Sequence, residues 1–118
     1  ALQGGAFPPA GLADRRAEAR PVFVNYPAAW CVSCQVNDKV ALSSAAVHDA
    51  LARTDTAYLK ADWTNRNAEI AAELASHGRA GVPLYLVYSV RGGGPEILPS
   101  ILTPGVVVRA LDAAANPQ

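Results

Sequence analysis

Two cysteines separated by only two residues constrain this chain more than any other feature of its sequence. They lie in the run Cys31-Val32-Ser33-Cys34, and the 118 residues contain no other cysteine. A framework of structural disulfides needs several pairs at longer range, and a structural zinc site needs four ligands. A haem attachment motif requires histidine after the second cysteine, where this chain has Gln35. The pair therefore indicates a redox-active dithiol.

Composition limits the other classes of function. Hydrophobic residues make up 51% of the chain, which predicts one packed domain. The net charge is zero and basic residues do not cluster, so nucleic acid is not an expected partner. No apolar run approaches the roughly 20 residues that span a bilayer. We expect a flexible leader over 1–11 and one domain over 12–118, monomeric and excised from a longer protein.

The order of expected elements indicates an α/β fold. Strands are expected at 21–26, 57–62, 84–90 and 96–98, and helices at 12–19, 31–42, 44–53, 64–77 and 104–114. Val32, Val36 and Val40 recur every four residues and predict an apolar helix face. Thr64 or Asn65 is expected to cap the fourth helix. The alternation predicts a central mixed β-sheet flanked by helices on both faces.

The cysteine pair falls where a strand gives way to a helix, and this placement suits thiol exchange. Cys31 would begin the helix, where free backbone N–H groups favour a thiolate. Cys34 would lie one turn further on and face inward. We therefore assign Cys31 as the attacking thiol and Cys34 as the resolving thiol. Trp30 is expected to cover one side of the site, although a purely packing role would explain it equally well.

A second run, residues 81–83 (GVP), precedes the strongest predicted strand. Proline is common at the first position of a strand without any function, and few X–Pro bonds are cis. The backbone at Val82 and Pro83 would be free to pair with a partner strand beside the sulfurs.

These motifs resemble the thioredoxin superfamily. Residues 29–37 (AWCVSCQVN) and 58–65 (YLKADWTN) more closely resemble the C-terminal periplasmic domain of DsbD-type thiol:disulfide interchange proteins. The related ScsB proteins, linked to copper tolerance, share this pattern. The resemblance covers about residues 20–112 and implies a thioredoxin fold with Pro83 as its cis-proline.

The resemblance also implies a function. The chain would be a protein-disulfide reductase domain of an inner-membrane protein, working in the periplasm through a Cys31–Cys34 redox-active disulfide and no other cofactor. It would accept electrons from a transmembrane domain of the same polypeptide. It would pass them to periplasmic thioredoxin-like or disulfide-bearing proteins.

Two acids common in such relatives are missing. Asn25 stands six residues before Cys31, where the superfamily often has a buried acid, and Ala29 stands where such domains often have another. Asp38 matches a position where they carry an acid, and it either replaces the missing carboxylate or is an ordinary solvated charge. With fewer acids nearby, we expect the Cys31 pKa to be lower than in acid-bearing relatives.

Two alternatives remain open from sequence. Two thiolates suit Cu(I), so a copper-binding module of the same fold is one, although neither His48 nor His77 has a motif that brings it to the pair. A disulfide oxidase or isomerase is the other, since only the reduction potential sets the direction of exchange.

Overall fold

A computed structural model describes residues 5–6 and 19–116 as a sheet covered by helices. Among these residues the strands are β1 (Gly5–Ala6), β2 (Val22–Tyr26), β3 (Ala57–Lys60), β4 (Leu84–Tyr88) and β5 (Glu96–Ile97). They form one sheet in the order β1-β3-β2-β4-β5. β3 pairs in parallel with β1 and β2, and β4 pairs antiparallel with β2 and β5. The predicted mixed sheet is confirmed.

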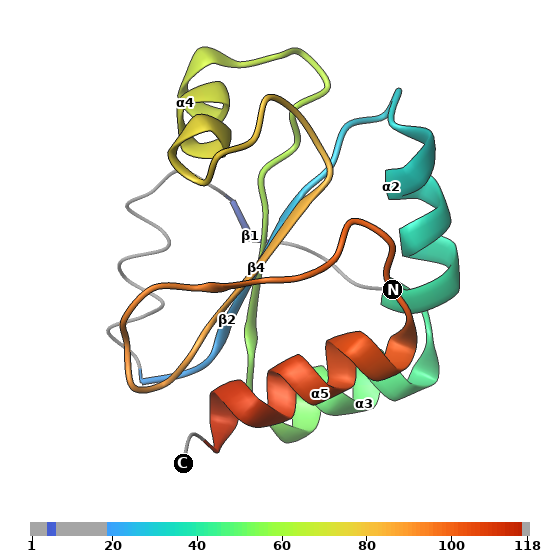
Figure 1. Cartoon of the computed structure of the whole chain (residues 1–118). Helices are drawn as coiled ribbons and strands as arrows, with labels where there is room; N and C mark the ends of the chain where they lie inside the picture. Colours follow the sequence, from blue (N-terminus) through green and yellow to red (C-terminus); the bar gives the residue numbers. More distant parts are fainter. Residues whose placement is uncertain (1–4, 7–18, 117–118) are drawn as a thin grey trace.

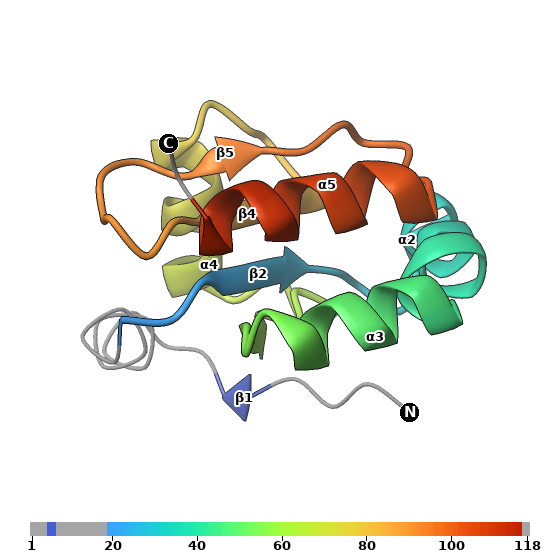
Figure 2. The same cartoon turned by 90° about the horizontal axis from the view of Figure 1, so that it is seen from below.

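Helices cover both faces of this sheet (Figures 1 and 2). They are α2 (Val32–Asn37), the π-helical turn η1 (Asp38–Leu42), α3 (Ala45–Arg53), α4 (Ala68–Ser76) and α5 (Pro104–Ala115). Residues of η1, α3 and α5 pack on one face, where Asn37 of α2 also bonds to Tyr85. The α4 helix packs on the other face. Ser44 and Thr103 cap α3 and α5, each accepting a backbone N–H. These caps explain why the two helix starts could be predicted.

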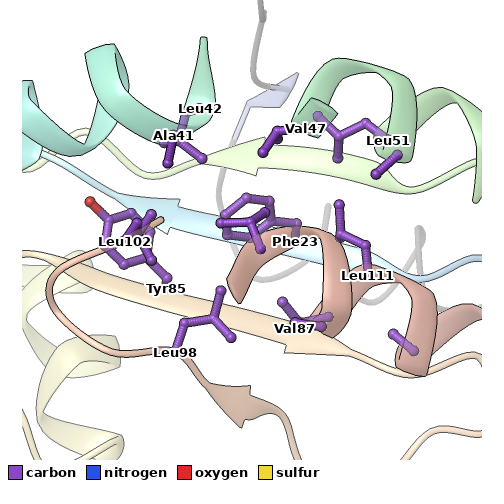
Figure 3. Packing of buried hydrophobic residues seen from close by; sticks show 14 residues of the cluster. Phe23, Ala41, Leu42, Val47, Leu51, Tyr85, Val87, Leu98, Leu102 and Leu111 are labelled. Atoms are coloured by element: carbon purple, nitrogen blue, oxygen red, sulfur yellow. The ribbon is translucent and has the colours of Figure 1, made fainter. Parts of the chain in front are cut away.

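Two buried clusters hold the layers together. Every residue of β2 and β4 is buried, as expected for central strands covered on both faces. On one face Phe23 and Tyr85 pack under Leu42, Val47 and the α5 helix (Figure 3). On the other face the cluster includes Val24, Leu59, Leu86, Trp63 and Leu74. The central strand β2 is therefore fixed from both sides, and its carboxyl end carries the cysteine loop.

The helix expected over 31–42 is present as α2 and η1, so the valine spacing that predicted it is confirmed. Val32, Val36 and Val40 share a face, but their exposed fractions are 73%, 50% and 51%. Asn37 faces the core instead and is 1% exposed. Its Nδ2 donates to the Tyr85 hydroxyl and to a backbone carbonyl of the loop before α5, both at 2.8 Å. A buried amide with satisfied hydrogen bonds thus orients this helix, and the valines lie on its solvent side.

Replacing Val36 by alanine is expected to leave stability unchanged or raise it by up to about 0.5 kcal/mol. Alanine is the better helix former, and a half-exposed valine contributes little burial. Urea denaturation measures the free energy of unfolding. The matched control is Val47→Ala, at a valine with no exposure, where a loss of about 2 kcal/mol is expected. A comparable loss in both variants would contradict the exposed placement of Val36.

Other boundaries also differ from the expectation. The fourth helix begins at Ala68 and is capped by Asn67, whose Oδ1 accepts from the Ile70 N–H at 3.1 Å, so the predicted cap at Thr64 or Asn65 is wrong. Two residues of the expected leader, 5 and 6, form β1, while the rest of it and nearly all of the expected helix at 12–19 lie outside the described residues. Within the described part of the chain, no helix has the length and apolar character needed to cross a membrane.

Candidate active site

The antiparallel register of β2 and β4 brings two distant sequence segments together. Tyr26 at the end of β2 pairs with Leu84 at the start of β4. The loop that follows β2 therefore lies against the residues that precede β4. Val82 packs on the buried cluster of Ala28, Cys31 and Cys34. The Val82–Pro83 peptide bond is cis, as the resemblance implies.

The two cysteines form a disulfide at the start of α2. Their Cα atoms lie 5.3 Å apart, and their exposed fractions are 6% for Cys31 and 3% for Cys34. Cys31 is the N-cap residue of α2, and its Sγ accepts the backbone N–H of Cys34 at 3.2 Å. A donor aimed at this sulfur stabilises a thiolate once the disulfide is reduced. The local geometry thus supports Cys31 as the nucleophile.

A partly open cavity of about 210 Å³ lies beside the second cysteine. Cys34, Asp38, Lys60 and Asp62 are among its lining residues. Burial raises the pKa of Asp38 above its ordinary value, and the charge of Lys60 partly counteracts this rise. Asp38 therefore lines the same cavity as Cys34, and its role as a replacement for the missing acid stays a prediction.

Asn25, which stands in place of the expected acid, is buried within β2. It is 1% exposed, and its Nδ2 donates to the Tyr58 hydroxyl at 2.7 Å. Its Oδ1 is buried and has no hydrogen-bond partner among the described residues. Burial raises the pKa of Tyr58, although the bond from Asn25 lowers it, and the nearby charge of Asp38 raises it further. Because Asn25 cannot titrate, proton transfer at this position must use another group.

Thr64, expected from sequence only as a helix cap, connects the cysteine loop to the segment after β3, and this role was missed. Its Oγ1 accepts the Ala29 N–H at 2.8 Å, and its carbonyl accepts the Trp30 indole N–H at 3.0 Å. The Thr64 hydroxyl in turn donates to Asp62. Gln35 adds a further bond from its Nε2 to the Ala29 carbonyl at 2.6 Å. An Asp two residues before a Thr is a turn motif, and this was the available sequence clue.

Trp30 has the packing role expected of it, whereas its covering one side of the site stays a prediction. The residue is 45% exposed beside the disulfide, and its ring packs against the buried Trp63 with centroids 6.0 Å apart. Among the described residues no group of three or more His, Cys, Asp and Glu is placed to hold a metal ion. Neither His48 nor His77 lines the cavity beside Cys34.

A disulfide at a helix start, beside a cis-proline on a five-stranded mixed sheet, defines a thioredoxin-fold disulfide-exchange site. The model of the thioredoxin-like family matches residues 6–89, and the chain belongs to this family. Family, fold and cysteine pair together support thiol–disulfide oxidoreductase activity. This confirms the class of fold and of function expected from sequence.

Relatives and solved structures agree with the sequence resemblance. The chain is 34% identical over 77 residues to the thiol:disulfide interchange protein DsbD of Salmonella typhimurium and 36% identical to that of Yersinia enterocolitica. Each match covers 65% of this chain and 13% of the relative. The oxidised DsbD C-terminal domain of Neisseria meningitidis has a TM-score of 0.73 at 23% identity, covering 95% of this chain and 99% of that one. A thioredoxin from Thermus thermophilus has a TM-score of 0.73 at 18% identity, and the match covers 98% of this chain and 89% of that one.

Proposed function

We propose that this chain is the terminal electron-passing domain of a longer DsbD-like protein of the bacterial inner membrane. It receives electrons from a membrane-embedded domain of the same polypeptide and passes them to disulfide-bearing proteins in the periplasm. The observation that carries the proposal is the Cys31–Cys34 disulfide, with a donor aimed at one sulfur and a polar cavity beside the other. The short match to relatives of much greater length supports the larger architecture.

The chemistry proceeds in two exchange steps. In the reduced chain the Cys31 thiolate attacks a sulfur of the partner disulfide, and the other partner sulfur leaves as a thiolate that takes up a proton. Cys34 then loses its proton and attacks the Cys31 sulfur, which releases the second partner thiol and closes the Cys31–Cys34 disulfide. Two electrons and two protons pass to the partner. Two thiols of the membrane-embedded donor restore the dithiol by the reverse sequence.

The surrounding residues position the partner in this proposal. Val82 packs against the buried cluster that contains both cysteines, so a segment that reaches Cys31 also meets the backbone around Pro83. This backbone pairs with the partner in an extended conformation and holds its disulfide in line with the attacking sulfur. Trp30 covers the opposite side and limits the access of water.

The reduction potential of the Cys31–Cys34 couple tests the direction of electron flow. A reductase is expected to lie nearer about −270 mV than about −120 mV. The chain is equilibrated with dithiol buffers of graded potential, quenched with acid and alkylated, and its reduced fraction is measured by mass spectrometry. A value near about −120 mV would identify an oxidant and contradict the proposal.

A further inference from the structure

Arg66 lies over the tryptophan that precedes the attacking cysteine. Its Cζ is 4.3 Å from the centroid of the Trp30 ring and 5.3 Å from that of Trp63. The two rings are tilted by 57°, so the guanidinium occupies the angle between them. Cation–π contacts of this kind are worth roughly 0.5–1 kcal/mol at an exposed site. They fix the position of a charged side chain that would otherwise move freely in solvent.

The backbone of Arg66 is in an unusual conformation for its residue type. Its φ is 52°, in the left-handed region that disfavours L-residues with long side chains. Asparagine tolerates this region much better, and Asn65 and Asn67 flank the position. The conformation alone would favour asparagine or glycine here. The backbone conformation therefore does not explain an arginine at this position.

The guanidinium of Arg66 has no acidic partner among the residues that the structure describes. The side chain is exposed, and the nearby carboxylate of Asp62 accepts the hydroxyl and the backbone N–H of Thr64. A guanidinium presents its N–H donors in a planar fork that matches the two oxygens of a carboxylate. A cation held against Trp30 thus lies beside the residue that directly precedes the attacking cysteine.

We propose that Arg66 is a specificity residue that binds a carboxylate of the partner protein, carried close to the partner's reacting cysteine. The inference rests on the proposed exchange function and adds the chemistry of the partner to it. Trp30 is adjacent to Cys31 in the chain and is anchored by the Thr64 carbonyl, so the cation is held at a constant place relative to the attacking sulfur. Partners with Asp or Glu beside the cysteine are selected over partners with Lys or Arg there.

The test uses three short peptides, each with a single cysteine. The residues that flank this cysteine are Glu in the first peptide, Gln in the second and Lys in the third. The cysteine carries a pyridyl disulfide. The Cys31 thiolate of the reduced chain attacks the peptide sulfur, the bond to the pyridyl sulfur breaks, and the pyridine thiol leaves with the electron pair and takes a proton. Its absorbance gives the rate of this first step. The Glu peptide is expected to react about three to five times faster than the Gln peptide at low ionic strength. About 1 M salt should remove most of the difference.

Variants at Arg66 separate recognition from structure. The quantity compared is the rate with the Glu peptide divided by the rate with the Gln peptide. Arg66→Gln is expected to bring this ratio to about one, while its rate with the Gln peptide stays within about twofold of the native rate. Arg66→Asn should lose the ratio in the same way without a lower melting temperature, because asparagine relieves the backbone strain. Arg109→Gln, at an exposed arginine on α5, makes the same change in net charge and should keep the ratio.

Two results would overturn the proposal. One is a Glu preference that survives in Arg66→Gln. The other is an equal fall of all three rates, which would show that Arg66 acts only by supporting Trp30. A chain that releases no pyridine thiol from any peptide would instead contradict the exchange function itself.

Discussion

A Cys34→Ala variant is expected to lose turnover by roughly a thousandfold or more and to accumulate a covalent adduct with its partner. The donor to the Cys31 sulfur is the backbone N–H of residue 34, which alanine retains. Attack by Cys31 on a partner disulfide therefore continues. No thiol then remains in the chain to break the mixed disulfide, since the sequence has only these two cysteines. Non-reducing electrophoresis and mass spectrometry detect the adduct.

The matched control for this variant is Cys31→Ala. Its remaining thiol, Cys34, lies within α2 rather than at the N-cap, where free backbone N–H groups would favour a thiolate. Neither turnover nor adduct is expected from this variant. Adduct formation by Cys31→Ala and none by Cys34→Ala would reverse the two roles assigned to the cysteines.

The parts of the fold that could be predicted are those in which local sequence and burial agree. β2 and β4 are largely apolar, with Asn25 as the polar exception, because helices cover both of their faces. Ser44 and Thr103 mark helix starts by satisfying backbone N–H groups. The position of the disulfide followed from the boundary between β2 and α2. The orientation of α2 did not, because hydrophobic spacing identifies a face without showing where it points. The three long-range hydrogen bonds of Asn37 decide that orientation.

The residues whose roles sequence analysis missed act across long separations in the chain. Thr64 contacts Ala29 and Trp30, which are 35 and 34 residues away. Arg66 meets Trp30 only because the turn after β3 folds back beside the cysteine loop. Such contacts depend on the packing of complete elements, and a motif of a few residues does not contain them. Two pairing residues are likewise too few for a recognisable strand pattern, and this explains the omission of β1.

Asp38→Asn is expected to slow the resolving step by about 10- to 100-fold at neutral pH while leaving attack by Cys31 nearly unchanged. Cys34 must lose its proton before it can attack the mixed disulfide, and a positioned base typically contributes about a hundredfold or more to such a transfer. Asp38 shares a cavity with Cys34, and Asn25 cannot serve as the base. In the native chain the resolving rate should rise with pH through the raised pKa of Asp38. The variant should lack that rise.

Although Asp38→Asn should slow the resolving step, it should not lower the free energy of unfolding. Burial raises the folded-state pKa of Asp38 above the ordinary value of 3.8, so the folded chain binds this proton more tightly than the unfolded chain. The stabilising effect of the protonated group is complete below the unfolded pKa and is lost as the pH rises through the folded pKa. At pH 7 the ionised carboxylate therefore destabilises the fold, and Asp38→Asn should equal or exceed the native chain in its free energy of unfolding.

Single-turnover release of the peptide from Cys31 measures the resolving step, and urea denaturation across pH measures stability. Asp49→Asn, at an exposed carboxylate on α3, controls for the loss of one negative charge and should change neither. An unchanged resolving rate in Asp38→Asn would show that Asp38 is only a solvated charge. Slower resolution without a loss of stability would identify a carboxylate retained for proton transfer, because the fold itself is no weaker without it.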